Sequence, residues 1–159
     1  FYKRRKNKVI HKNKILFSGQ AGKPEYFLRN ELLKNILLDE NLSRNLIISN
    51  IERNLDWNTY IENLLSYPCI INPVGTLQAL NTRAYEVLYS GRILLQQTFG
   101  EYKRHSKMLK QYKNLLLFES FEELSSILQS LNLDELHEND CYKNNNIFKR
   151  FESINLKIN

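Results

Sequence analysis

Cysteine and long apolar runs are scarce in this chain of 159 residues. The two cysteines, Cys69 and Cys141, are too few and too far apart for a disulfide framework, so a reducing compartment is the simpler expectation. The sequence has no run of about 18 apolar residues that could cross a bilayer, and no apolar signal-peptide core opens it. The sequence therefore predicts a cytoplasmic protein, with a peripheral position at a membrane surface as the alternative.

Residues that bind metal ions are also sparse. The three histidines, His11, His105 and His137, are dispersed in polar stretches, where we expect them to face solvent. Neither histidines nor acidic residues cluster at the spacing of metal ligands. We therefore expect no metal site.

The positive charge is concentrated at the start of the chain. Residues 1–14 hold seven basic residues and no acidic one. Removing those seven from the 23 basic residues of the chain leaves 16 against 17 acidic residues, so the remainder is balanced. The basic segment 1–13 could contact phosphates or an anionic membrane, but such runs are commonly solvated tails, and we expect it to lie outside the core.

Short apolar runs alternate with segments of helical periodicity between residues 14 and 131. The runs that predict strands are 14–18, 46–48, 69–71, 93–96 and 115–118. The segments that predict helices follow Pro24, Asp56, Asn81 and Ser120, with a more polar one at 102–112. In the first helix, apolar stripes are expected at Leu28, Leu32 and Ile36 and at Phe27, Leu33 and Leu37.

This alternation is typical of crossover units in a parallel sheet. We expect one three-layer, Rossmann-like α/β domain over 14–131, with a mainly parallel sheet of about five strands. The strand at 93–96 should be central, because its apolar run is continuous rather than alternating. Residues 132–159 are expected to form a polar loop and a C-terminal tail.

Two segments follow predicted strands, where ligands bind in such sheets. The first contains Gly19, Gly22 and Lys23, whose backbone N–H groups and ammonium could cradle a phosphate. Pro24 stands where a P-loop needs serine or threonine, so a P-loop is excluded. A purely structural glycine turn is the alternative for this loop taken alone.

The second segment runs from Asn72 to Thr82 and leads into a helix that Asn81 can cap. Free N–H groups at that helix start favour an anion such as a diphosphate. Glu86, one turn further on, could accept from two neighbouring sugar hydroxyls. The alternative is a surface salt bridge between Glu86 and Arg83, three residues earlier.

From residue 14 to about residue 129 the chain resembles the carboxy-terminal, nucleotide-sugar-binding half of a GT-B glycosyltransferase. The likeness is to exostosin-like enzymes and bacterial family-1-like transferases. The matching segments are 16–19 with Arg29, 60–66, 71–75, 82–91, 92–95 and 117–124. The most distinctive is an arginine followed by glutamate and glycine, here Arg83, Glu86 and Gly91. Arg92 departs from the family, which commonly has a small or apolar residue there.

The resemblance implies that Glu86 holds the nucleotide ribose, while Arg83 and either Lys23 or Arg29 face the diphosphate. The further donor-binding residues that it implies are Gly19, Asn72, Gly75, Asn81 and Thr82. It also implies transfer of a sugar from a nucleoside-diphosphate sugar to a glycan, lipid or protein acceptor, without a separate cofactor. The catalytic residues remain unassigned.

Enzymes of this type work between two halves, so an N-terminal domain is expected to be missing and the chain alone is not expected to be active. Two other classes stay open. One is a non-catalytic Rossmann-like nucleotide-binding or interaction module. The other is a basic nucleic-acid-binding protein that uses residues 1–14, although no specific nucleic acid is indicated.

Overall fold

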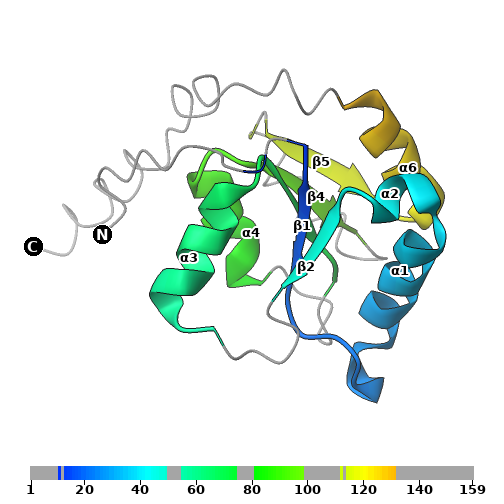
Figure 1. Ribbon diagram of the computed structural model, residues 1–159, viewed down its shortest axis with the longest axis horizontal. Helices are drawn as coiled ribbons and strands as arrows, with labels where there is room; N and C mark the ends of the chain where they lie inside the picture. Colours follow the sequence, from blue (N-terminus) through cyan, green and yellow to red (C-terminus); the bar gives the residue numbers. More distant parts are fainter. Residues whose placement is uncertain are drawn as a thin grey trace, which may run out of the picture.

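Five strands of the computed structural model form one parallel sheet (Figure 1). The structure describes residues 11, 13–49, 55–74, 81–98, 112 and 114–131. The strands are β1 (Ile15–Ser18), β2 (Leu46–Ser49), β3 (Cys69–Asn72), β4 (Ile93–Gln97) and β5 (Leu115–Phe118). Their order is β2-β1-β3-β4-β5, and every neighbouring pair is parallel. The expected α/β fold with a parallel sheet of about five strands is confirmed.

Helices cover both faces of this sheet, which makes three layers (Figure 1). The helices are α1 (Phe27–Leu38), α2 (Glu40–Ser43), α3 (Trp57–Ser66), α4 (Thr82–Tyr89) and α6 (Phe121–Ser130), with a 3-10 turn, η1, at Pro24–Tyr26. In the view of Figure 1, α3 and α4 lie to the left of the sheet, and α1, α2 and α6 lie to the right. Each face of the sheet packs against its helices in a separate hydrophobic core. Alternating residues of the strands belong to the two cores, because successive side chains point to opposite faces.

The inner strands are buried on both faces. All residues of β1, β3 and β4 are buried, as the continuous apolar runs indicated. The position expected for the strand at 93–96 needs a refinement. β4 does have a neighbour on each side, but the middle of the sheet is β3, which pairs with β1 and β4.

The strand order reverses beside β1. The chain passes from β1 outward to β2, then crosses back so that β3 lies on the other side of β1. The connections that leave β1 and β3 therefore diverge to opposite faces of the sheet. Such a switch point opens a crevice at the carboxyl ends of the two strands, and this is where open α/β sheets bind ligands.

Three helices begin at the caps that the sequence predicted. Asp56 accepts from the N–H groups of Asn58 and Thr59, and Asn81 accepts from the N–H of Ala84. Ser120 accepts from the N–H of Glu123 at the start of α6. Side-chain oxygens thus satisfy N–H groups that a helix start leaves without an internal partner.

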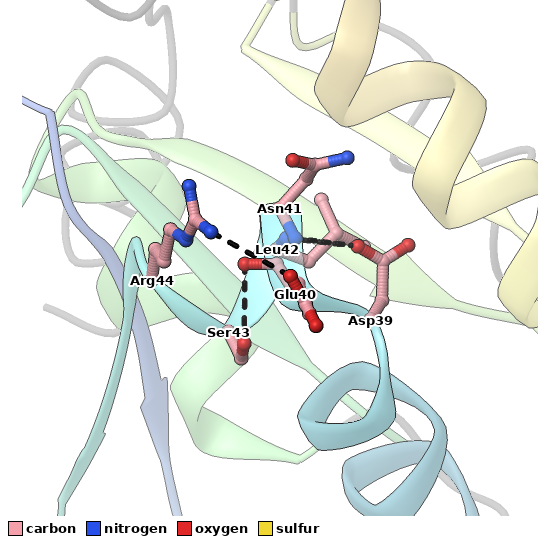
Figure 2. Close-up of polar contacts among 6 residues, drawn as sticks. All are labelled: Asp39, Glu40, Asn41, Leu42, Ser43 and Arg44. Carbon is pink, nitrogen blue, oxygen red and sulfur yellow. Dashed lines mark hydrogen bonds and ion pairs between the residues drawn. The ribbon is translucent and has the colours of Figure 1, made fainter.

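The short helix α2 was not expected from the sequence. Its cap is Asp39, which accepts from the N–H groups of Asn41 and Leu42, as Figure 2 shows. Leu42 is buried against the core, while Arg44 and Glu40 form an exposed ion pair with 3.6 Å between Nη2 and Oε2. Four residues give too little periodicity for a sequence pattern to reveal.

Arg92, where the sequence departs from the family pattern, does not disturb β4. Its guanidinium is buried and donates to the carbonyl of Leu65 at 2.6 Å, and β4 begins at Ile93. None of the helices in the described ranges has the length and apolar character needed to cross a membrane. Of the basic segment 1–13, the structure describes residues 11 and 13, and both are exposed. The rest of that segment, the expected helix at 102–112 except its last residue, and the tail 132–159 lie outside the described residues.

Candidate functional site

Most of the predicted site residues gather at the crevice between β1 and β3. Gly19 follows β1 directly, and its N–H donates to the carbonyl of Ser49 at the end of β2. Asn72 is the last residue of β3, and Asn81 caps α4, which starts at the same edge of the sheet. The parallel strands bring these residues together because their carboxyl ends share one edge.

Gly19 leaves space for the guanidinium of Arg83. The backbone at Gly19 has φ of 152°, and a Cβ atom there would lie 2.7 Å from Arg83 Nη1. That distance is shorter than van der Waals contact, so a side chain could not coexist with the present position of Arg83. The first glycine of the loop thus allows an arginine from α4 to lie against the backbone that follows β1.

Arg29 brings a second guanidinium to the same loop. It lies on the buried face of α1 with 6% of its surface exposed, and its Nη1 donates to the carbonyl of Gln20 at 2.6 Å. The guanidinium carbon lies 5.0 Å from the centre of the Tyr26 ring. Burial and then the nearby positive charge of Arg83 lower the pKa of Arg29. Two like charges therefore lie close to the Gly19–Gln20 backbone.

Neither arginine has an acidic partner within the described residues. The ion pair found there joins Arg44 to Glu40 on the surface. Arg29 is buried, and buried charges are normally paired because burial without a counter-charge is unfavourable. Two buried polar atoms, Ser18 Oγ and Arg29 Nε, also lack a hydrogen-bond partner among the residues that the structure describes. Such an arrangement has the charge and the free donors that could bind an external anion.

The loop that follows Gly19 is held by side chains from the start of α1. The Tyr26 hydroxyl donates to Gln20 Oε1 at 2.7 Å, and Asn30 accepts from the N–H of Gly22 while donating to the carbonyl of Lys23. The Lys23 side chain is exposed. Of the two basic residues considered for this position, Arg29 is the one whose side chain contacts the loop, through the carbonyl of Gln20.

Buried amides fix the position of Asn72 at the end of β3. Asn72 and Asn81 exchange two side-chain hydrogen bonds of 3.1 Å each, and Asn72 Nδ2 also donates to Gln96 Oε1 at 2.6 Å. Asn72 Oδ1 is thereby directed toward Arg83, whose Nη1 donates to it at 3.4 Å. The network ties β3, β4 and the cap of α4 into one unit around the crevice.

Tyr60 joins Glu86 to Arg83. Its hydroxyl donates to Glu86 Oε2 at 2.7 Å and accepts from Arg83 Nε at 3.3 Å. Burial, opposed by the charge of Arg83, raises the pKa of the Tyr60 hydroxyl, so it remains a donor at neutral pH. No Arg83–Glu86 ion pair is present among the described contacts, so the simple salt bridge considered for these two residues is replaced by a bridge through tyrosine.

Tyr60 was not among the site residues predicted from the sequence. Its spacing with Leu64 and Leu65 marked it as an ordinary apolar position of α3, and its ring is indeed packed in the core. The hydroxyl at the end of that ring was the available indication, since buried tyrosine hydroxyls usually find a polar partner.

Changing Tyr60 to phenylalanine is expected to lower the free energy of unfolding by about 1 kcal/mol, because one buried hydrogen-bonded hydroxyl is lost while the ring stays. Chemical denaturation measures this change. The matched control is Tyr85→Phe on α4, where the side chain is partly exposed and no contact of its hydroxyl constrains the site. Equal stabilities for both variants and the wild type would show that the bridge through Tyr60 does not stabilise the site.

The remaining predicted residues lie at the margin of the crevice or outside the described ranges. Thr82 is the first residue of α4 and is exposed, and Gly75 falls outside the described residues. No group of histidine, cysteine or acidic side chains within the described part could hold a metal ion. No protein-family model matches the chain, and no curated protein is significantly similar to it.

Proposed function

We propose that this chain is the donor-binding half of a GT-B glycosyltransferase, which holds a nucleoside-diphosphate sugar in the crevice between β1 and β3. The observation that carries the proposal is the pair of guanidinium groups, Arg29 and Arg83, close to the Gly19–Gln20 backbone without an acidic partner in the described residues. A diphosphate has the charge and the acceptor oxygens that such a pair can bind.

The rest of the nucleotide has a partner beside the arginines. Glu86 is half-buried, and only its Oε2 accepts a bond from Tyr60, so the carboxylate retains acceptor capacity for sugar hydroxyls. The start of α4, capped by Asn81, contributes a favourable field for the phosphates. Ribose at Glu86 and diphosphate at the arginines is the order in which a nucleoside diphosphate would lie.

The resemblance adds the reaction. In enzymes of this type the nucleoside diphosphate leaves from the anomeric carbon while an acceptor from the other half of the molecule attacks. Arg29 and Arg83 would stabilise the negative charge that develops on the departing diphosphate. This half would supply the leaving-group stabilisation, and the other half would supply the acceptor.

Calorimetric titration of the whole chain with uridine, guanosine and adenosine diphosphates tests the proposal. At least one is expected to bind, and to raise the melting temperature because it binds the folded state only. The corresponding nucleotide-sugar should bind at the same site and compete. Binding of nucleotides without any competition by nucleotide-sugars would instead favour a non-catalytic nucleotide-binding module, and no binding would contradict both.

Glu86→Gln is expected to lower the affinity for the preferred nucleoside diphosphate by about tenfold. The substitution keeps the shape but removes the negative charge, and hydrogen bonds to charged groups contribute roughly 1.5–3 kcal/mol. Titration of the variant measures the change, with pyrophosphate as a ligand that has no ribose and should bind both proteins alike. Glu31→Gln, an equivalent change on the exposed face of α1, is the control. Unchanged nucleotide affinity in Glu86→Gln would remove Glu86 from the site.

A further inference from the structure

Trp57 lies exposed at the edge of the sheet that carries the candidate site. It is the first residue of α3, and helix starts in a parallel α/β fold lie at the carboxyl ends of the strands. Trp57 is the only tryptophan of the chain, and 56% of its surface is exposed. Asp56 caps this turn through the N–H groups of Asn58 and Thr59, so the backbone that carries the indole is fixed.

The indole is the outer member of a continuous row of side chains. Its ring lies 5.8 Å from the ring of Tyr60 with a tilt of 41°. The hydroxyl of Tyr60 binds both Glu86 and Arg83, and Arg83 lies against Gly19. An exposed aromatic ring is therefore linked, through Tyr60, to a carboxylate and a guanidinium.

These three neighbouring groups match the three parts of a nucleoside diphosphate, which are an aromatic base, a sugar with hydroxyl groups and an anionic diphosphate. We propose that Trp57 is the stacking surface for the nucleobase of the ligand, an inference that rests on the proposed function and names a further contact of the same site. A heteroaromatic base stacks on an exposed indole, whereas ribose requires hydrogen-bond acceptors and diphosphate requires cations. Stacking tolerates any base, so Trp57 would contribute affinity rather than discrimination between bases.

Because the chain contains one tryptophan, its fluorescence reports on this position alone. Titration of the whole chain with uridine, guanosine or adenosine diphosphate is expected to quench the selectively excited emission, in step with binding measured by calorimetry. Pyrophosphate and ribose 5-phosphate, which lack a base, should bind more weakly and leave the emission unchanged. Equal quenching by pyrophosphate or ribose 5-phosphate would overturn the proposal, because the indole would then be responding to something other than a base.

Substitution gives the second arm of the test. Trp57→Ala should lower nucleoside-diphosphate affinity about tenfold and leave pyrophosphate affinity unchanged, whereas Trp57→Phe, which retains an aromatic face, should stay within about threefold of the wild type. Leu38→Ala removes another exposed apolar side chain, at the far end of α1, and serves as the control.

The outcomes separate this inference from the proposed function. Nucleotide binding that depends on Arg83, with no quenching and no loss in Trp57→Ala, would overturn the stacking proposal and leave the donor-site proposal intact. No nucleotide binding by the wild type would overturn both. Quenching by every nucleotide together with weaker binding in Trp57→Ala would support both.

Discussion

Replacing Arg83 by alanine is expected to lower the affinity for nucleoside diphosphates by about a hundredfold. Removing a guanidinium that donates two charge-assisted hydrogen bonds to phosphate lowers the binding free energy by roughly 3 kcal/mol. Because about 1.4 kcal/mol corresponds to a factor of ten in affinity, this is about a hundredfold. The loss should be nearly as large for pyrophosphate and small for the free nucleoside, because the partner of Arg83 is phosphate. Calorimetric titration with the three ligands measures this pattern.

The stability of the same variant distinguishes a ligand site from a structural contact. Arg83 donates only long hydrogen bonds, of 3.3 and 3.4 Å, to uncharged groups, and it lies beside the like charge of Arg29. Its removal relieves that repulsion, so the free energy of unfolding without ligand should change little. A residue kept for binding at no benefit to stability behaves in this way.

Arg44→Ala is the matched control for that experiment. Arg44 lies four residues after Glu40, much as Arg83 lies three residues before Glu86, but Arg44 and Glu40 form an ion pair on the exposed surface. Its removal should change neither affinity nor stability appreciably, since exposed ion pairs contribute little. A large loss of stability in Arg83→Ala, with nucleotide affinity unchanged, would assign Arg83 a structural role and contradict the proposed function.

The fold was accessible from the sequence because its determinants are local. The continuous apolar residues of β1, β3 and β4 require burial on both faces, and the side chains of Asp56, Asn81 and Ser120 specify where helices begin. The position of β4 was less accessible. An apolar run shows that a strand is covered on both faces, but not which inner position in the sheet it takes.

The sequence predicted those site residues whose positions follow from the strand topology alone. Gly19, Asn72 and Asn81 come together because they follow or adjoin the carboxyl ends of parallel strands. The i, i+3 spacing places Trp57 and Tyr60 on one face of α3, yet Tyr60 is buried and Trp57 is exposed. Periodicity describes the face of a helix, but it does not show whether the first turn of that face is covered by the rest of the fold.

The spacing of the buried residues in α1 could have shown that Arg29, and not Lys23, is the basic residue that contacts the first loop. Arg29, Leu32, Leu33 and Ile36 follow the i, i+3, i+4, i+7 spacing, and all four are buried. The stripe expected through Phe27 and Leu37 is wrong in this respect, because both side chains are exposed. An arginine in phase with the buried face of a helix is unusual enough to indicate a role, since such charges are rarely buried without a partner.

Gly19→Ala is expected to reduce nucleoside-diphosphate affinity almost as much as Arg83→Ala, although it removes no polar group. The new Cβ atom would meet Arg83 Nη1 at 2.7 Å, and the flexible end of the arginine would move more readily than the backbone. Displacing the guanidinium takes away its contact with the phosphates. Titration should show a loss approaching a hundredfold, because a positioned charge contributes only while it is in place.

Gly22→Ala separates this effect from backbone strain. Gly22 also has a positive φ, of 85°, but a Cβ atom there would meet nothing within 4 Å. Alanine at either glycine is expected to lower the free energy of unfolding by about 1–2 kcal/mol, because both positions disfavour a side chain. Chemical denaturation should therefore show similar losses for the two variants, while only Gly19→Ala loses affinity.

Combining Gly19→Ala with Arg83→Ala gives the decisive measurement. If Gly19 acts by making room for Arg83, the alanine at position 19 has no guanidinium to displace once Arg83 is also alanine. The double variant should then bind nucleoside diphosphates no more weakly than Arg83→Ala alone. Groups that act through one contact are non-additive in this way, whereas independent sites add. Losses that add in the double variant would mean that Gly19 contacts the ligand itself and that its packing against Arg83 is incidental.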